Sequence, residues 1–202
     1  MQLVRARRLK PGQLVTFTGA GGKTSALQRL LKEIPQDSPL LLTTTTHLGQ
    51  QQLRQVETHW IDDGQGDLAD LLSLLSREKR VLWTGPLDPP AEKWTGILPE
   101  RVDAIKAQVA ASGGIIVVEG DGARQRLVKA PAAHEPVIPA SSDLVVPMAN
   151  LAVLGEPLTE QFAHRPMRLA EVVGAEPGDR LRPAHLAQLM TSEEGELKAV
   201  PR

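Results

Sequence analysis

The chain has 202 residues, of which 41% are hydrophobic and 23% charged, and these are ordinary values for a globular protein. Its formal net charge of −1 excludes the strong basic field that attracts nucleic acid, and only 2% of its residues are aromatic, too few for base-stacking platforms. It has no cysteine, which excludes disulfides, thiolate zinc sites and iron–sulfur ligation by this chain.

We expect one domain over residues 1–202, because that length supports a single substantial core. No apolar run approaches the roughly 20 residues of a membrane helix, and residues 1–8 lack the apolar segment of a secretory signal. The sequence therefore predicts a cytoplasmic protein that binds neither membrane nor nucleic acid.

Near the N-terminus, the sequence predicts a strand, a glycine-rich turn and a helix. Residues 14–18 are mostly apolar or β-branched, Gly19, Gly21 and Gly22 follow within four positions, and residues 23–34 carry leucine and isoleucine at helical spacing. Glycines let consecutive N–H groups face one point, and the helix adds about half a positive charge at its N-terminus. Phosphate is the usual occupant of such a site.

This glycine loop departs from two standard motifs. Phe17 stands where G-x-x-x-x-G-K-[ST] has its first glycine, and Thr24 stands where G-x-G-x-x-G has its third. The alternative is a plain strand–helix connection. We expect Lys23 to reach the outer phosphates and the Thr24 hydroxyl to ligate Mg²⁺. The residues expected to bind nucleotide here are Gly19, Ala20, Gly21, Gly22, Lys23, Thr24 and Ser25.

Further along, strands alternate with helical patterns, which predicts a mostly parallel sheet with helices on both faces, a three-layer α/β domain like that of P-loop NTPases. Ligands of such sheets bind beyond the carboxyl ends of the strands, where we expect Thr45. Predicted strands cover 40–46, 59–61, 81–83, 115–118 and 144–147; predicted helices cover 51–57, 68–78, 98–109, 165–173 and 184–190; loops cover 87–99 and 130–139.

A second group of candidate residues follows the apolar run 115–118. Glu119 and Asp121, separated by Gly120, resemble the acidic end of a Walker B strand. Such a carboxylate can hold Mg²⁺ or polarise a nucleophile, while the alternative is an acidic turn after a buried strand. The residues alone leave open whether Glu119 or Asp121 lies nearer the metal.

Three further residues are candidates for ligand contact. Arg124 or Lys129 can clamp a phosphate, and His134 can act as an acid or base near neutral pH. The alternative is that the two cations are solvated and that the histidine is hydrogen-bonded within its loop. The predicted catalytic residues are Lys23, Glu119, Asp121 and His134; the Mg²⁺ candidates are Thr24, Glu119 and Asp121; the other predicted contacts are Thr45, Arg124 and Lys129.

Together, these motifs resemble the YqeC family of accessory proteins for selenium-dependent hydroxylases. The resemblance implies a P-loop-like domain linked to the maturation of selenium-dependent molybdenum hydroxylases, with a hydroxylase or its cofactor-maturation proteins as partners. The family usually has alanine where this chain has Gly120, and usually continues after residues 195–201 into another apolar strand, so we expect a shortened sequence or a member without that strand. The motifs lie at 19–24, 43–47, 118–124, 129–139, 155–158 and 164–166.

The expected function is a nucleotide-binding accessory protein, with ATP or GTP and Mg²⁺ as cofactors and NTPase activity. One alternative is an ATP-dependent ligase or kinase acting on a pterin-type or selenium-containing small molecule, because residues 19–24 also resemble the loop of Mur-type ligases. Another alternative is a non-catalytic chaperone that holds a phosphorylated cofactor at the anion site.

Overall fold

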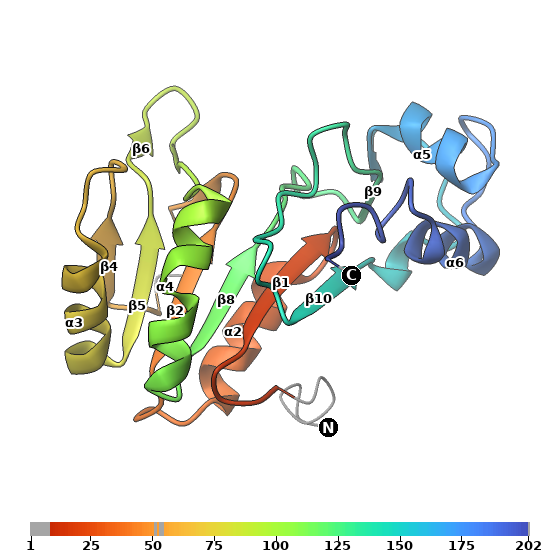
Figure 1. Ribbon diagram of the computed structural model, residues 1–202. Coiled ribbons are helices and arrows are strands. Elements are labelled where there is room, and N and C mark those ends of the chain that lie inside the picture. Colours follow the sequence, from red (N-terminus) through yellow and green to blue (C-terminus); the bar gives the residue numbers. More distant parts are fainter. Residues whose placement is uncertain (1–8, 51, 53–54, 202) are drawn as a thin grey trace.

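The protein is built on a six-stranded sheet in which every neighbouring pair of strands is parallel (Figure 1). The structure, a computed structural model, describes residues 9–50, 52 and 55–201. The strand order is β10-β1-β8-β2-β5-β4, so the strands that carry the glycine loop and the acidic turn are neighbours. The strands are β1 (Leu14–Gly19), β2 (Leu40–Thr44), β4 (Thr58–Ile61), β5 (Arg80–Thr84), β8 (Ile115–Glu119) and β10 (Leu144–Met148).

Helices cover both faces of this sheet, as predicted. Helix α2 (Lys23–Glu33) packs on one face, and α3 (Leu68–Glu78) and α4 (Pro99–Ala111) pack on the other. Strand β8 shows why its sequence is apolar throughout: Ile115 and Val117 join the core under α2, whereas Ile116 and Val118 join the core under α3 and α4. The predicted mixed α/β class is confirmed, and the arrangement is consistent with a P-loop NTPase-like fold.

The predicted rim of the sheet also forms. In the parallel registers, Phe17 of β1 and Thr44 of β2 both lie beside Glu119 of β8. The glycine loop, the threonine run and the acidic turn therefore leave the sheet at the same edge, where the carboxyl ends of parallel strands meet.

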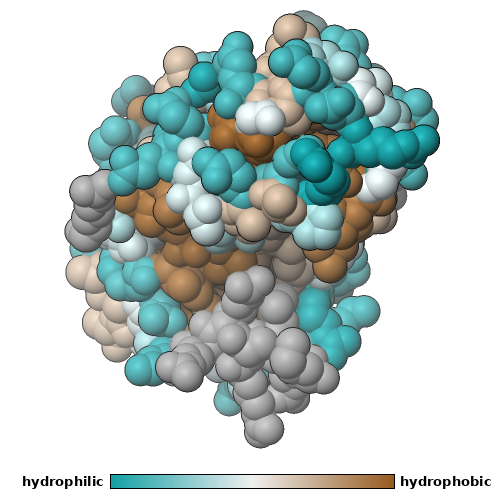
Figure 2. Space-filling model, turned by 90° about the vertical axis from the view of Figure 1, so that its right-hand side faces the viewer, coloured by the Kyte–Doolittle hydropathy of each residue, from teal (hydrophilic) through white to brown (hydrophobic). Residues whose placement is uncertain are grey.

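At the β10 edge of the sheet, the C-terminal segments pack together with residues 127–130 in a third apolar cluster. Figure 2 shows this end of the molecule, where hydrophobic residues remain visible among hydrophilic ones; Leu151 and Met167 are the large apolar side chains of these segments that are most exposed. The elements are β9 (Val128–Lys129), the 3₁₀ turn η1 (Leu151–Val153), β11 (Ala163–His164), α5 (Pro166–Val173) and α6 (Pro183–Thr191).

Some predictions need correction. The stretch 87–99, predicted as a loop, contains β6 (Leu87–Asp88) and β7 (Lys93–Trp94), which form a small antiparallel sheet with β3 (Leu48–Gly49). Strands of two residues are too short to show a period in the sequence. The helix predicted over 51–57 lies partly outside the described residues. Within the described chain, no helix is long and apolar enough to span a bilayer.

Candidate functional site

The glycine loop is shaped by its glycines in two ways. Gly19, Gly21 and Gly22 have φ values of +80°, +75° and +117°, a region that residues with a Cβ rarely adopt. In addition, a Cβ on Gly19 would lie 2.2 Å from the Met148 carbonyl oxygen, and one on Gly21 would lie 2.4 Å from Cβ of Asn150. The loop is therefore packed closely against the end of β10 and the residues that follow it.

The backbone of this loop leaves a row of hydrogen-bond donors without partners. The N–H of Ala20 donates to Met148 O and the N–H of Ala26 donates to Gly22 O, both at 2.8 Å. Between them, the N–H groups of residues 21–25 have no acceptor among the described residues, and no side chain caps α2 at Gly22. Such a row at a helix N-terminus favours a phosphate.

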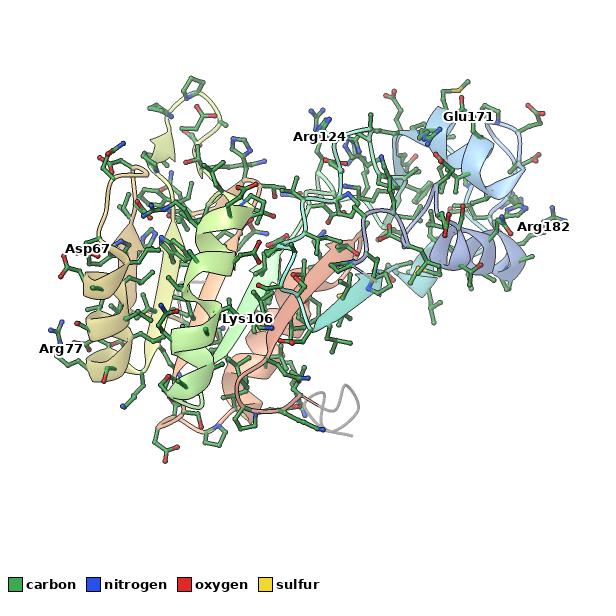
Figure 3. The ribbon with its side chains drawn as sticks, viewed as in Figure 1. Asp67, Arg77, Lys106, Arg124, Glu171 and Arg182 are labelled. Carbon is green, nitrogen blue, oxygen red and sulfur yellow. The ribbon has the colours of Figure 1, made fainter. Side chains whose placement is uncertain are left out.

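These donors border a cavity of about 890 Å³. Glu119 is one of its lining residues, and the loop Gly122–Leu127 forms another part of its wall. Figure 3 shows Arg124, on that loop, at the end of the molecule to which the carboxyl ends of the strands point. The cavity is lined by residues 21–25, 91–93 and 122–127 and by His47, Gly49, Gln50, Gln52 and Glu119.

Glu119 combines burial with an oxygen that has no partner. Its Oε1 lies 4.0 Å from Nζ of Lys23, and its Oε2 is buried and makes no hydrogen bond to the described residues. Burial raises the pKa of this carboxyl group to about 7; the attraction of Lys23 opposes the rise but is smaller, and the repulsion of Asp121 adds to it. A carboxyl group with this pKa, on a residue that lines a cavity, can take up or release a proton near neutral pH.

Asp121 has different surroundings, because it lies beneath the loop rather than in the cavity wall. It is 1% exposed. Its Oδ2 accepts hydrogen bonds from the N–H of Gly19 at 3.0 Å and lies 3.0 Å from Nζ of Lys129, while its Oδ1 accepts from Nζ of Lys23 at 2.8 Å. Lys23 also donates to the Gly19 carbonyl. Asp121 thus ties both ends of the glycine turn together, and Glu119 is the carboxylate that faces the cavity.

Lys129 continues this buried network away from the cavity. It is 0% exposed and donates to Gly122 O at 2.9 Å and to Glu135 Oε2 at 2.8 Å. Glu135 also accepts from Arg165 at 2.7 Å. Although burial opposes ionisation, the hydrogen bonds from Arg165 and Lys129 lower the pKa of Glu135 to about 2. The sequence predicts Arg124 or Lys129 as a phosphate clamp; here the ammonium group of Lys129 is bonded to Gly122 O and Glu135 instead.

The remaining predicted residues divide between the cavity and its surroundings. Thr24, Ser25 and Arg124 line the cavity, and the Thr24 hydroxyl accepts a hydrogen bond from the Gln52 amide at 3.0 Å. Arg124 is exposed and has a left-handed backbone, with φ of +47°. Thr45 and His134 are not among the lining residues. The Thr45 hydroxyl donates to Val137 O at 2.6 Å, and His134 is exposed on its loop.

Sequence reasoning missed Glu196, which approaches the glycine loop from the C-terminal segment. It is 2% exposed, and its Oε2 accepts a hydrogen bond from the Thr18 hydroxyl at 3.1 Å. Burial, and then the charge of Asp121, raise its pKa to about 7. The polar run 192–196 carries three glutamates, and nothing in it sets Glu196 apart except the preceding Gly195, whose Cβ would lie 2.2 Å from Leu189 O.

Comparison with known proteins places the chain in a family. A family model described as "YqeC protein" matches residues 15–167. The chain belongs to the YqeC family. An uncharacterized YqeC protein of Escherichia coli strain K12 is 31% identical over 198 residues, which cover 94% of this chain and 72% of that protein. No solved structure matches. The family-matched residues of this YqeC chain include the glycine loop, Glu119 and Asp121, but they end before Glu196.

Proposed function

We propose that this YqeC chain binds a nucleoside triphosphate, ATP or GTP, together with Mg²⁺ at the glycine loop and hydrolyses its terminal phosphate. One observation carries the proposal: the unpartnered N–H groups of residues 21–25 border a cavity that Glu119 also lines, and one buried oxygen of Glu119 has no hydrogen-bond partner among the described residues. A donor row suits the phosphates, and a carboxyl group beside it suits an attacking water.

The residues of the loop would bind and orient the phosphates. Their oxygens would accept the N–H groups of residues 21–25. Lys23 lines the cavity and holds Asp121 and the Gly19 carbonyl, so it would exchange these partners for a phosphate oxygen by turning its flexible stem. Its charge would then stabilise the charge that grows on the transferred phosphoryl group.

Glu119 would act on the attacking water. Above its pKa of about 7, its carboxylate would accept the proton of a water molecule that attacks the terminal phosphorus. The bond from that phosphorus to the bridging oxygen would break, which gives a nucleoside diphosphate and inorganic phosphate. The exposed guanidinium group of Arg124 would contact a phosphate oxygen from the cavity wall.

The described residues fit a magnesium ion bound together with a nucleotide. They contain no group of three or more His, Cys, Asp or Glu side chains that could hold a metal alone. Mg²⁺ needs only one or two protein oxygens beside phosphate oxygens and water, and the Thr24 hydroxyl and the Glu119 carboxyl group both line the cavity. When bound, the ion would neutralise charge on the phosphate oxygens.

The place of this reaction in the cell rests on the family resemblance. We propose that it serves the maturation of selenium-dependent molybdenum hydroxylases, with the hydroxylase or its cofactor-maturation proteins as partners. Mass spectrometry of small molecules that copurify with the protein, scanned for phosphate, molybdenum and selenium, tests this placement. Copurified nucleotide with neither metal nor selenium would support binding at the loop but not the pathway.

A second candidate is transfer of the phosphoryl group to another small molecule, as a kinase or ligase performs. The observation that favours it is that Lys93 and Arg126, in addition to Arg124, line a cavity at the upper end of the usual size range, roughly 300–1,000 Å³. Nucleoside diphosphate released only after a pterin-type or selenium-containing acceptor is added would favour transfer. Lasting binding without turnover, even beside a hydroxylase, would favour a cofactor chaperone instead.

Calorimetric titration with Mg-ATP and Mg-GTP tests nucleotide binding. We expect Lys23→Ala to weaken the affinity at least tenfold, and Lys32→Ala, an exposed lysine in the last turn of the same helix, to leave it unchanged. Thr24→Ala provides a second variant that leaves the buried lysine in place, and thermal unfolding checks each protein. Equal affinity in wild type and both site variants, or no binding of either nucleotide by wild type, would refute the proposal.

A further inference from the structure

Glu196 links the C-terminal segment to the base of the glycine loop. Thr18, which donates to its carboxyl group, lies 178 residues earlier and directly precedes the first glycine of the turn. The same oxygen, Oε2, lies 3.1 Å from the position that a Cβ on Gly19 would occupy. The carboxyl group is therefore packed against the point at which β1 becomes the loop.

The backbone around Glu196 is held on two sides. On one side, the N–H of Glu196 donates to Leu189 O of α6 at 2.9 Å, and this close approach requires Gly195. On the other side, Lys198 donates to the carbonyl groups of Ala132 and Ala133. The C-terminal segment thus spans from α6 to the loop 130–139, and these contacts on both sides fix the position of the Glu196 carboxyl group beside the glycine loop.

This placement has an energetic cost. Glu196 is buried near Asp121, and burial together with this charge opposes its ionisation more strongly than the Thr18 hydroxyl, Lys129 and Lys23 favour it. At this position the carboxyl group makes its contacts with Thr18 and Gly19. Buried polar groups kept at such a cost gather at functional sites.

We propose that Glu196 is a positioning residue of the glycine loop. By accepting the Thr18 hydroxyl and packing against Gly19, it fixes the turn from which residues 21–25 direct their N–H groups at a phosphate. The C-terminal segment is then part of the binding site, although it lies outside the family-matched residues. This inference rests on the proposed nucleotide binding.

A double-mutant cycle tests the coupling between the two side chains. Calorimetry measures the affinity for Mg-ATP and Mg-GTP in wild type, Glu196→Ala, Thr18→Val and the double variant. We expect each single variant to weaken binding about tenfold, and the double variant to bind no worse than the weaker single variant. Glu196→Gln, whose amide oxygen still accepts the Thr18 hydroxyl, is expected to bind like wild type. Glu194→Ala, an exposed neighbour, is the control.

Each outcome decides the inference. If wild type binds nucleotide and Glu196→Ala binds equally well, or if the two single effects add, Glu196 does not position the loop, while the proposed function stands. If wild type binds neither nucleotide, both proposals fall. If Glu196→Ala lowers the melting temperature, the test rests on Thr18→Val, which keeps nearly the same side-chain shape, and on Glu196→Gln. Weakened binding by Thr18→Val together with full binding by Glu196→Gln supports the inference.

Discussion

Replacing Asp121 with asparagine tests whether the buried network holds the fold together around the loop. The carboxylate compensates Lys23 and Lys129, whose side chains are 5% and 0% exposed. Asparagine keeps the size but removes the charge, so two buried ammonium groups lose a partner. Breaking a buried ion pair from one side costs about 3–5 kcal/mol, a large share of the roughly 5–15 kcal/mol that stabilises a domain.

The assay is urea unfolding together with thermal unfolding at pH 7. For a chain of this length, about 2–4 °C of melting temperature corresponds to each kcal/mol, so Asp121→Asn should lower the melting temperature by about 6–20 °C. Asp37→Asn, at an exposed turn, is the matched control and should change stability by less than about 0.5 kcal/mol. A loss below about 1 kcal/mol for Asp121→Asn would show that the two lysines do not depend on this carboxylate.

Three further predictions concern the loop and its surroundings. Gly21→Ala should lower both stability and nucleotide affinity, because its Cβ would lie 2.4 Å from Asn150 Cβ. Gly155→Ala, also at positive φ but facing open space, should lower only stability. Equal losses of nucleotide affinity in the two variants would contradict this prediction. Because burial raises the pKa of Glu119 to about 7, the folded state holds an extra proton between about pH 4.5 and 7, and stability falls as pH rises through that window. Glu119→Gln should therefore match wild type at pH 4.5 and exceed it by up to about 3 kcal/mol at pH 8 in urea unfolding; parallel profiles would refute the assignment. Gly120→Ala would bring a Cβ within 2.8 Å of the Thr16 methyl group, so it should lower the melting temperature, and Thr16→Ser in the same chain should restore it.

The central layers of the fold could be predicted from the sequence because their signals are local. The run 115–118 is apolar at every position and ends at a charged residue, and the leucines of 68–78 repeat at helical spacing. Both elements form as predicted, as β8 and α3. The small sheet of β3, β6 and β7 depends instead on contacts between strands of two residues, which leave no pattern within any one of them.

The candidate site was only partly predictable, for a similar reason. The sequence places Glu119 and Asp121 at one rim but does not say which faces the cavity, because that depends on Lys129, which approaches Asp121 from β9. The burial of Lys129 in turn depends on Glu135 and Arg165, which lie 30 residues apart. Glu196 reaches the loop only through the packing of the C-terminal segment, so no local sequence pattern predicts its place in the site.

The two lysines on Asp121 have a physical consequence for ligand binding. If Lys23 alone compensated this carboxylate, its movement toward a phosphate would leave a buried charge without a partner, at a cost of several kcal/mol. Lys129 remains 3.0 Å away on the other oxygen, and the N–H of Gly19 still donates to the same group. Lys23 can therefore leave Asp121 while the carboxylate stays paired and the loop stays anchored. In the proposed nucleotide complex, this buried network would therefore free Lys23 to move toward a phosphate without leaving Asp121 unpaired.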